Sequence, residues 1–152
     1  RKAGLEPSAE IQRLEHRPAE REWAEKLGLR ENAPVVVMRR LRKADGQPIA
    51  LAWNVFIEEQ VGQTLESGIW QDSIFLHMET RCGVKIASAR ALISALRPDC
   101  PYDRLAKETL GDSALLMRRL HFDLKGAPVL YSLDYIRTDL VDLIVRQQRG
   151  FY

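Results

Sequence analysis

Hydrophobic and polar residues follow two different periods in the first third of the chain. Residues 9–17 alternate weakly with a period of two, which is typical of a β-strand. Pro18 is a favourable first residue of a helix, and Trp23 and Leu27 then fall on one helical face. Gly28 follows at the point where a helix commonly ends in a left-handed residue. This segment therefore predicts a strand and then a short helix.

A hairpin is expected next. Residues 35–43 begin with three valines, and β-branched residues favour strands. Asp45 and Gly46 have the chemistry of a two-residue hairpin turn, so a second strand is expected at 48–57. One face of this second strand is wholly apolar and should pack under helices: Ile49, Leu51, Trp53 and Val55. The other face contains Ala50, Ala52, Asn54 and Phe56.

The same unit of strand, helix and hairpin occurs a second time. The tetrapeptide Met-Arg-Arg-Leu at 38–41 recurs at 117–120, and Gly46 and Pro48 recur as Gly126 and Pro128. Upstream, the spacing from Pro18 to Gly28 equals the spacing from Pro101 to Gly111. The second unit is predicted as a strand at 85–96, a helix at 101–110 and a hairpin with strands at 114–124 and 127–137.

Between the units, residues 58–67 and 73–82 are predicted to be helices, with Asp72 or Ser73 as an N-cap and Gly83 as the stop. Residues 139–147 are apolar enough to pack as a short strand or helix. Hairpins force antiparallel pairing. We therefore predict an α+β fold in which one mainly antiparallel six-stranded sheet has its helices on one face. A pseudo-twofold relation would leave a cleft for a ligand at the junction of the two units.

Composition and charge limit the class of protein. The 152 residues fit one domain, and a formal net charge of +2 argues against a strongly basic nucleic-acid-coating protein. No apolar run approaches the length of a membrane helix. Cys82 and Cys100 form no metal motif, so we expect free thiols in a reducing cytoplasm. The chain begins with Arg1 and not Met, and we expect it to be part of a longer protein.

Arginine is the basic residue with a candidate role. Arg40 and Arg42 share one face of their predicted strand, and two guanidinium groups on one face can clamp a carboxylate or phosphate. The alternatives are a solvated sheet face or structural ion pairs. The equivalent positions of the second unit are Arg119 and His121, which would enter the same cleft. The alternative for His121 is a structural hydrogen-bonding role. Ser73, at a predicted helix start, can either cap the helix or also contact an anion.

Catalytic and metal-binding motifs are absent from the sequence. It contains no nucleophile elbow, no zinc-binding H-E-x-x-H, no P-loop and no dinucleotide fingerprint. We therefore predict no catalytic residues, no metal and no cofactor. Trp23 and Trp53 are expected in the core, while Trp70, in a predicted loop, suits either a lid or a buried plug.

The order of these motifs resembles the effector-binding (UTRA) domain of GntR-superfamily transcription regulators of the HutC type. The resemblance covers nearly the whole chain. The first hairpin, Val-Met-Arg-Arg-Leu-Arg-Lys-Ala-Asp-Gly-Gln-Pro-Ile-Ala at 37–50, is its most specific part. Weaker matches are the Pro18 to Leu29 segment, Asp-Ser-Ile-Phe at 72–75, Gly-Ala-Pro-Val at 126–129 and Tyr-Ile-Arg-Thr-Asp at 135–139.

This resemblance implies a chorismate-lyase-like fold and a missing N-terminal winged-helix domain. Residues 1–8 would then be a linker remnant and residues 9–152 the effector-binding domain. A small anionic metabolite would bind it, and a homodimer would transmit the change to operator DNA through the missing domain by shifting populations. The domain itself would contact neither DNA nor a membrane.

The resemblance also assigns site residues. Arg40 and Arg42 match the anion-binding arginines of the family, Ser73 matches a hydroxyl at the helix start, and Phe75 matches a position that is often Tyr. Ala52, Leu130 and Ile136 depart from it, because Glu, an acid and Tyr are common there, and this favours a flatter, more apolar anion. Apolar walls would come from Phe75, Trp53 or Tyr135. The expected effector site is Arg40, Arg42, Ala52, Ser73, Phe75, Arg119, His121 and Tyr135.

Two other functions stay open at this point. A small enzyme of the chorismate-lyase type would share the fold and would also clamp a dicarboxylate with arginines. A plain dimerisation module would have the same fold with an empty cleft.

Overall fold

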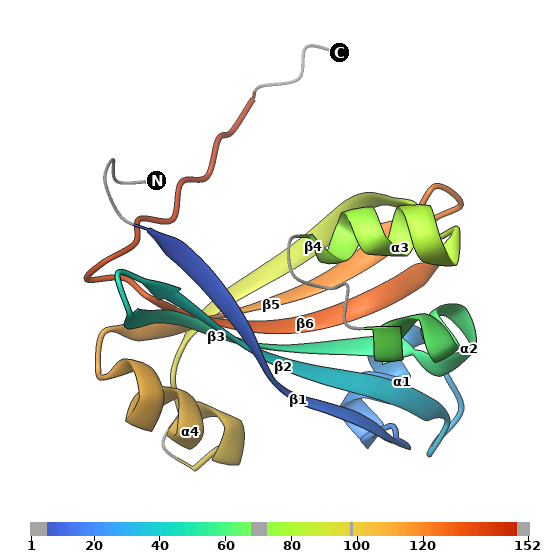
Figure 1. Cartoon of the computed structure of the whole chain (residues 1–152), viewed down its shortest axis with the longest axis horizontal. Helices are drawn as coiled ribbons and strands as arrows, with labels where there is room; N and C mark the ends of the chain where they lie inside the picture. The colour runs from blue at the N-terminus through green and yellow to red at the C-terminus, as the bar shows by residue number, and fades with distance from the viewer. Residues whose placement is uncertain (1–5, 68–72, 98, 149–152) are drawn as a thin grey trace.

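The computed structural model describes residues 6–67, 73–97 and 99–148, which fold around one six-stranded antiparallel sheet (Figure 1). The strands are β1 (Pro7–Pro18), β2 (Pro34–Ala44), β3 (Gln47–Ile57), β4 (Ile86–Ala95), β5 (Ala114–Asp123) and β6 (Pro128–Arg137). The helices are α1 (Arg21–Leu27), α2 (Glu58–Val61), the 3-10 helix η1 (Gly62–Ser67), α3 (Ile74–Cys82) and α4 (Pro101–Leu110). The predicted α+β fold is confirmed.

The strand order β1-β2-β3-β6-β5-β4 shows the predicted repeat directly. Each unit contributes three neighbouring strands, and the units meet where β3 pairs with β6. At this junction Ala52 lies opposite Asp134 and Asn54 lies opposite Ser132. In the repeat, Ala52 corresponds to Ser132 and Asn54 to Asp134, so the two cross-strand pairs are pseudo-twofold mates.

The two hairpin turns differ. Asp45 and Gly46 both have positive φ angles, 49° and 75°, as a two-residue type I′ turn between β2 and β3 requires. The turn between β5 and β6 is longer, and the Asp123 carboxylate accepts hydrogen bonds from the backbone N–H groups of Lys125 and Ala127, both at 2.9 Å. The first turn therefore depends on backbone conformation, while the second also depends on a side chain.

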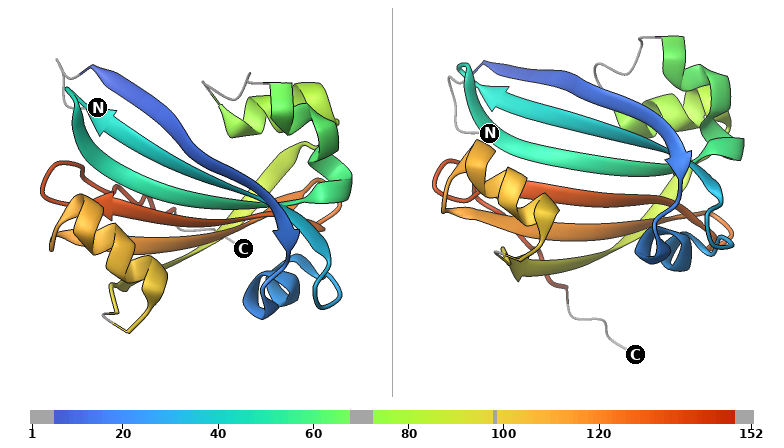
Figure 2. Two further views of the ribbon diagram at one scale, coloured as in Figure 1. Left: turned by 60° about the horizontal axis from the view of Figure 1, so that its bottom comes forward. Right: turned by 90° about the horizontal axis from the view of Figure 1, so that it is seen from below.

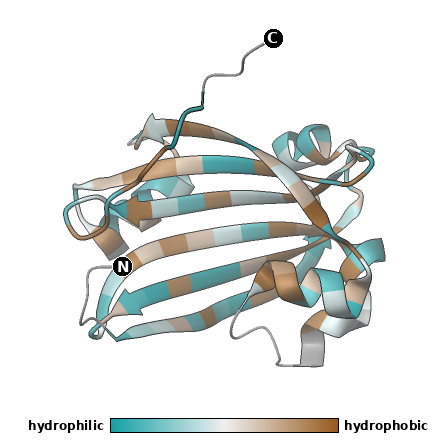
Figure 3. Cartoon of the chain, turned by 90° about the horizontal axis from the view of Figure 1, so that it is seen from above, coloured by the Kyte–Doolittle hydropathy of each residue, from teal (hydrophilic) through white to brown (hydrophobic). Residues whose placement is uncertain are grey.

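Helices cover both faces of the sheet, which corrects the prediction that they lie on one face (Figure 2). On one face, α1 and α4 pack over a core that includes Trp23, Trp53 and Leu116. On the other face, α2, η1 and α3 cover a smaller core that includes Phe56 and Met78. Hydropathy alternates along the strands (Figure 3). Because apolar residues of β2, β3 and β6 also occupy part of the second face, that face needs a cover of its own.

The two units interlock on the face of α1 and α4. Helix α1 contacts β6 of the other unit, and α4 contacts β3. The Tyr131 hydroxyl donates to Glu22 of α1 at 2.9 Å, and the Tyr135 hydroxyl donates to Asp103 of α4 at 2.6 Å. Each helix is therefore held by a tyrosine of β6, and the two repeats share one core.

Several boundaries differ from the sequence-based expectation. Residues 58–67 form a short α-helix followed by a 3-10 helix, and β1 begins at Pro7, inside the expected linker at 1–8. The expected packing of residues 139–147 is wrong: they form neither strand nor helix, and Leu143, Ile144 and Val145 are exposed (Figure 1). Trp70 and Asp72 lie outside the described residues.

Candidate functional site

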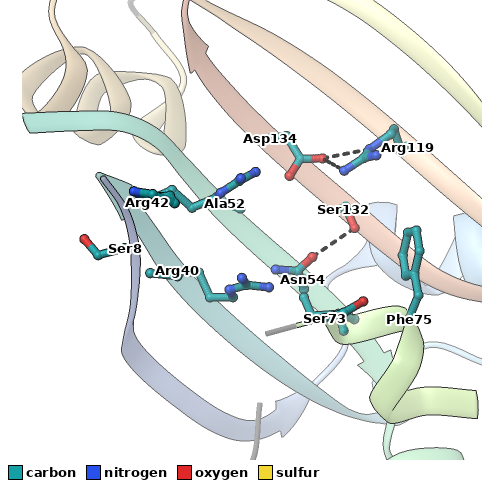
Figure 4. Close-up of a pocket in the computed structure, with 13 residues that line it drawn as sticks. Ser8, Arg40, Arg42, Ala52, Asn54, Ser73, Phe75, Arg119, Ser132 and Asp134 are labelled. Carbon is teal, nitrogen blue, oxygen red and sulfur yellow. Dashed lines mark hydrogen bonds and ion pairs between the residues drawn. The ribbon is translucent and has the colours of Figure 1, made fainter. Parts of the chain in front are cut away.

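A cavity of about 470 Å³ lies on the α3 side of the sheet, across the junction of the two units (Figure 4). Its floor comes from β2, β3, β5 and β6, and its rim comes from the start of β1 and the start of α3. The lining residues are Pro7, Ser8, Ala9, Arg40, Arg42, Ala52, Asn54, Ser73, Ile74, Phe75, Arg119, Ser132 and Asp134. The cleft predicted at the junction is therefore present.

Arg40 and Arg42 both line this cavity because alternate residues of β2 share a face. Their neighbours on β3 are the small residues Ala52 and Ala50, which leave room above the strand. Among the described residues, neither guanidinium has a hydrogen bond or an ion pair with a carboxylate. Burial and the nearby Arg42 lower the pKa of Arg40, while Asp134 raises it. The two cations therefore repel each other and lack an acid of their own.

Arg119 occupies the equivalent place in the second unit but is neutralised. Its Nε and Nη2 atoms lie 2.9 and 2.8 Å from Oδ2 of Asp134, one strand away. Burial raises the pKa of Asp134, while the charge and hydrogen bond of Arg119 lower it, and Arg42 and Arg40 lower it further. The cavity thus contains three guanidinium groups and one carboxyl group among its lining residues.

A polar chain extends from the cavity floor into the core. The Ser132 hydroxyl donates to Oδ1 of Asn54 at 3.1 Å and lies 3.5 Å from Nε2 of His121. Because that hydroxyl proton is used, Nε2 of His121 is the donor, and its Nδ1 is a buried acceptor with no partner among the residues that the structure describes. Burial and the charge of Arg119 lower the pKa of His121 to about 4. The imidazole is therefore neutral at physiological pH.

The start of α3 forms the other side of the cavity. Ser73 is the N-cap of this helix, and its hydroxyl accepts a hydrogen bond from the backbone N–H of Leu76 at 3.3 Å. Phe75 is 42% exposed, and its ring packs edge-on against His121 with a centroid distance of 5.1 Å. A hydroxyl and an aromatic ring thus close the cavity opposite the arginines.

The structure brings together most of the residues expected from the sequence. Arg40, Arg42, Ala52, Ser73, Phe75 and Arg119 line the cavity. His121 lies behind Phe75 and is 1% exposed, so it supports the wall without lining it. Tyr135 and Trp53 lie on the opposite face, because each is one residue out of step with the cavity-lining positions of its strand. The expected contact of Tyr135 with a ligand is therefore not possible at this cavity.

Sequence reasoning missed three polar groups of the floor, namely Asn54, Ser132 and Asp134. Each could have been found from the period of two on its strand together with the 80-residue offset of the repeat. Leu130, where the resemblance leads one to expect an acid, is buried in the core beneath α3. The floor is therefore more polar than the departures from the family pattern suggested.

The described part of the chain gives direct information on metal ligands, membrane helices and cysteines. Its His, Cys, Asp and Glu side chains form no group of three that could hold a metal ion. None of its helices is both long enough and apolar enough to cross a membrane. Cys82 and Cys100 are free thiols.

Comparison with solved structures gives the same fold. PhnF from Mycobacterium smegmatis superposes with a TM-score of 0.83 at 17% identity, covering 97% of this chain and 65% of that one. The effector domain of the same PhnF gives 0.81 at 17% identity, covering 96% and 90%. A GntR-family regulator from Enterococcus faecalis V583 gives 0.79 at 22% identity, covering 92% and 100%. This chain therefore spans just under two thirds of the length of the PhnF chain.

Curated protein sequences include none that matches this chain. The family model of the UTRA domain, however, matches residues 2–142, which is nearly the whole sequence. That match agrees with the six-stranded fold and with the motifs of the first hairpin. The chain belongs to the UTRA domain family.

Proposed function

We propose that this chain is the ligand-sensing and dimerisation domain of a bacterial transcription regulator of the GntR superfamily, HutC type. A small anionic metabolite binds in the cavity between the sheet and α3, and the domain catalyses no reaction. The regulator acts in the cytoplasm and reaches operator DNA through a winged-helix domain outside this chain. Effector binding changes operator affinity because the ligand has different affinities for two arrangements of the dimer.

The observation that supports this proposal most directly is the charge of the cavity. Arg40 and Arg42 face it without an acid partner among the described residues, whereas Arg119 already has Asp134. Guanidinium groups bind carboxylate and phosphate through parallel N–H···O bonds, and these bonds are strongest when they are removed from water. A ligand that brings its own anion relieves the repulsion between the two cations. The cavity therefore suits a carboxylate or a phosphate.

The neighbours in structure support a regulatory role. Two of the solved structures that this chain resembles are the effector domain of PhnF and a GntR-family transcriptional regulator. The PhnF chain extends well beyond the part that matches this chain. We infer that this protein likewise has a separate DNA-binding part, and that this chain supplies the ligand-dependent half.

Two exposed apolar features support dimerisation. Strand β4 is an edge strand whose Leu92 and Ile93 are 63% and 47% exposed. The segment after β6 exposes Ile144 and Val145, at 90% and 71%. Unpaired strand edges and exposed apolar segments favour pairing with another copy. Ile93→Lys should shift the chain toward the monomer in size-exclusion chromatography with light scattering, and an unchanged mass would argue against this interface.

The anion site can be tested with a thermal-shift panel on the 152-residue chain. Inorganic phosphate, small mono- and dicarboxylates, sugar phosphates and neutral sugars would be compared. We expect anions to raise the melting temperature and neutral sugars not to. Arg40→Ala should abolish this stabilisation while the unliganded melting temperature changes little, whereas Arg30→Ala, which removes an exposed arginine elsewhere, should leave the stabilisation intact.

Two outcomes would contradict the proposal. A loss of melting temperature in Arg40→Ala as large as that of a core truncation would show that Arg40 is structural. Formation of 4-hydroxybenzoate from chorismate would support the lyase alternative in place of a sensor.

A further inference from the structure

A second groove lies on the opposite face of the sheet, between β1, β2 and α4. It has a volume of about 230 Å³. The lining residues are Arg13, Glu15 and Arg17 of β1, Val37 and Arg39 of β2, Trp53 of β3, and Pro101, Tyr102 and Leu105 of α4. We call it the rear groove. None of these residues lines the cavity described above.

The rear groove has an unbalanced positive charge. Arg13 forms an ion pair with Glu15, and Nη2 of Arg17 lies 3.3 Å from Oε1 of Glu20. Arg39, on β2, has no ion pair among the described residues, and its Nε is buried without a hydrogen-bond partner. Arg13 and Arg39 are also directly opposite each other on neighbouring strands, an arrangement in which like charges repel. One guanidinium is therefore left for an incoming anion.

Aromatic side chains give the rear groove an apolar body beside that cation. Trp53 is the cross-strand neighbour of Arg39 and is 6% exposed. Its ring meets Tyr102 edge-on, with centroids 5.1 Å apart. The Tyr102 hydroxyl is already used, because it donates to Glu20 at 2.6 Å. The floor and the α4 wall therefore offer ring surfaces and no free hydroxyl.

We propose that the rear groove is a second ligand site, which binds a small aromatic monocarboxylate. The carboxylate bonds the Arg39 guanidinium where it faces the groove, and the ring packs against Trp53, Tyr102 and Leu105. One uncompensated cation selects a single negative charge, and the volume limits the ligand to about the size of one substituted ring.

The position of the rear groove connects it to the cavity between the sheet and α3, which we call the effector cavity because it is the proposed effector site. Arg39 and Arg40 are consecutive residues of β2 and point to opposite faces. Trp53 likewise lies between Ala52 and Asn54, which line the effector cavity. A ligand in the rear groove thus contacts the strands that hold the effector, so each ligand is expected to change the affinity of the other.

The test uses benzoate as the probe and its neutral analogue benzamide as the comparison, in isothermal titration calorimetry on the 152-residue chain. Benzoate should bind and benzamide should bind at least about tenfold more weakly, because hydrogen bonds to charged groups contribute that much. Arg39→Met should weaken benzoate binding about tenfold or more, and Arg39→Lys should restore part of it. Arg30→Met changes an exposed arginine that lines neither the rear groove nor the cavity on the α3 side, so it is the matched control and should bind benzoate as the unmodified chain does.

Nuclear magnetic resonance locates the probe. The indole N–H signal of Trp53, assigned by its loss in Trp53→Phe, should shift on addition of benzoate. The proposal is overturned if millimolar benzoate does not bind, if benzamide binds equally well, or if Arg40→Met weakens benzoate binding and Arg39→Met does not. That last outcome would place the probe in the effector cavity. Melting curves of each variant establish that it is folded.

Discussion

The two halves of this domain carry the same arginine in opposite electrostatic states. Arg40 of β2 and Arg119 of β5 are equivalent in the repeat and line one cavity from its two sides. Arg119 bonds Asp134 on the neighbouring strand. The residue equivalent to Asp134 in the first half is Asn54, whose amide cannot neutralise a charge. Arg40 in the first half can therefore bind the anion of a ligand, whereas Arg119 in the second half is already paired with the carboxylate of Asp134.

The next residue on the same face of each strand, two positions further along, also carries a positive charge only in the first half. Arg42 of the first half is an exposed cation, whereas its equivalent, His121, is buried and neutral. Two sequence differences at equivalent positions of the repeat thus place an asymmetric charge pattern on a nearly symmetric backbone. A ligand with a single anionic end would have one orientation in this cavity. The predictions below alter these differences, beginning with the largest expected effect.

Asn54→Asp would give the first half its own carboxylate. By the pseudo-symmetry, the new carboxylate should contact Arg40 as Asp134 contacts Arg119, and anion affinity should fall about 100-fold. Titration calorimetry with the best anion from the thermal-shift panel would measure this. Asn54→Ala removes the amide without adding charge and should lose much less affinity. Equal losses in the two variants would refute the electrostatic explanation.

Asp134→Asn would make the second half resemble the first. Arg119 would lose its acid, and the free energy of unfolding should fall by about 2 kcal/mol, because the pair is only partly exposed to solvent. Anion affinity should rise about tenfold, since the cavity gains net positive charge. Chemical denaturation and titration measure the two effects. If the pair matters as proposed, the double variant with Arg119→Met should regain part of the lost stability.

The buried His121 should make the free energy of unfolding depend on pH. Its folded-state pKa is lowered to about 4 from an ordinary value of 6.5, so protons bind the unfolded chain first as the pH falls. Relative to pH 7, this histidine alone should cost about 2 kcal/mol of unfolding free energy at pH 5. Denaturation curves at both pH values would show it, and His121→Asn should remove most of that loss. An unchanged pH dependence in His121→Asn would contradict the prediction.

The smallest effect concerns the first hairpin turn. Gly46 has a φ of 75°, and an added Cβ would meet no atom within 4 Å, so only backbone strain opposes a side chain there. Gly46→Ala should lower the free energy of unfolding by about 1 kcal/mol, while Gly46→Asn should cost less, because asparagine tolerates this conformation. Thermal denaturation would distinguish the two. A larger loss for Asn than for Ala would show that the turn has another constraint.

Most of the fold could be predicted from local patterns. The Asp45-Gly46 turn, the helix stop at Gly28 and the Ser73 cap each depend on residues a few positions apart, so the sequence displays them directly. The repeat also predicted that Arg40 and Arg119 would meet in one cleft. The side of the sheet on which α2 and α3 lie was not predictable in this way, because it depends on which apolar residues of distant strands remain uncovered.

The candidate site shows the same division between local and distant information. Alternation along β2 by itself placed Arg40 and Arg42 on one face and Arg39 on the other. It could not determine that Asp134 neutralises Arg119, that Tyr135 points away toward Asp103, or that α4 lies over Arg39 and Trp53. These contacts join residues far apart in the chain. The sequence by itself therefore determined the elements and the faces of their side chains, while the tertiary structure decided which charges remain unpaired, because a charge finds its partner through space and not along the chain.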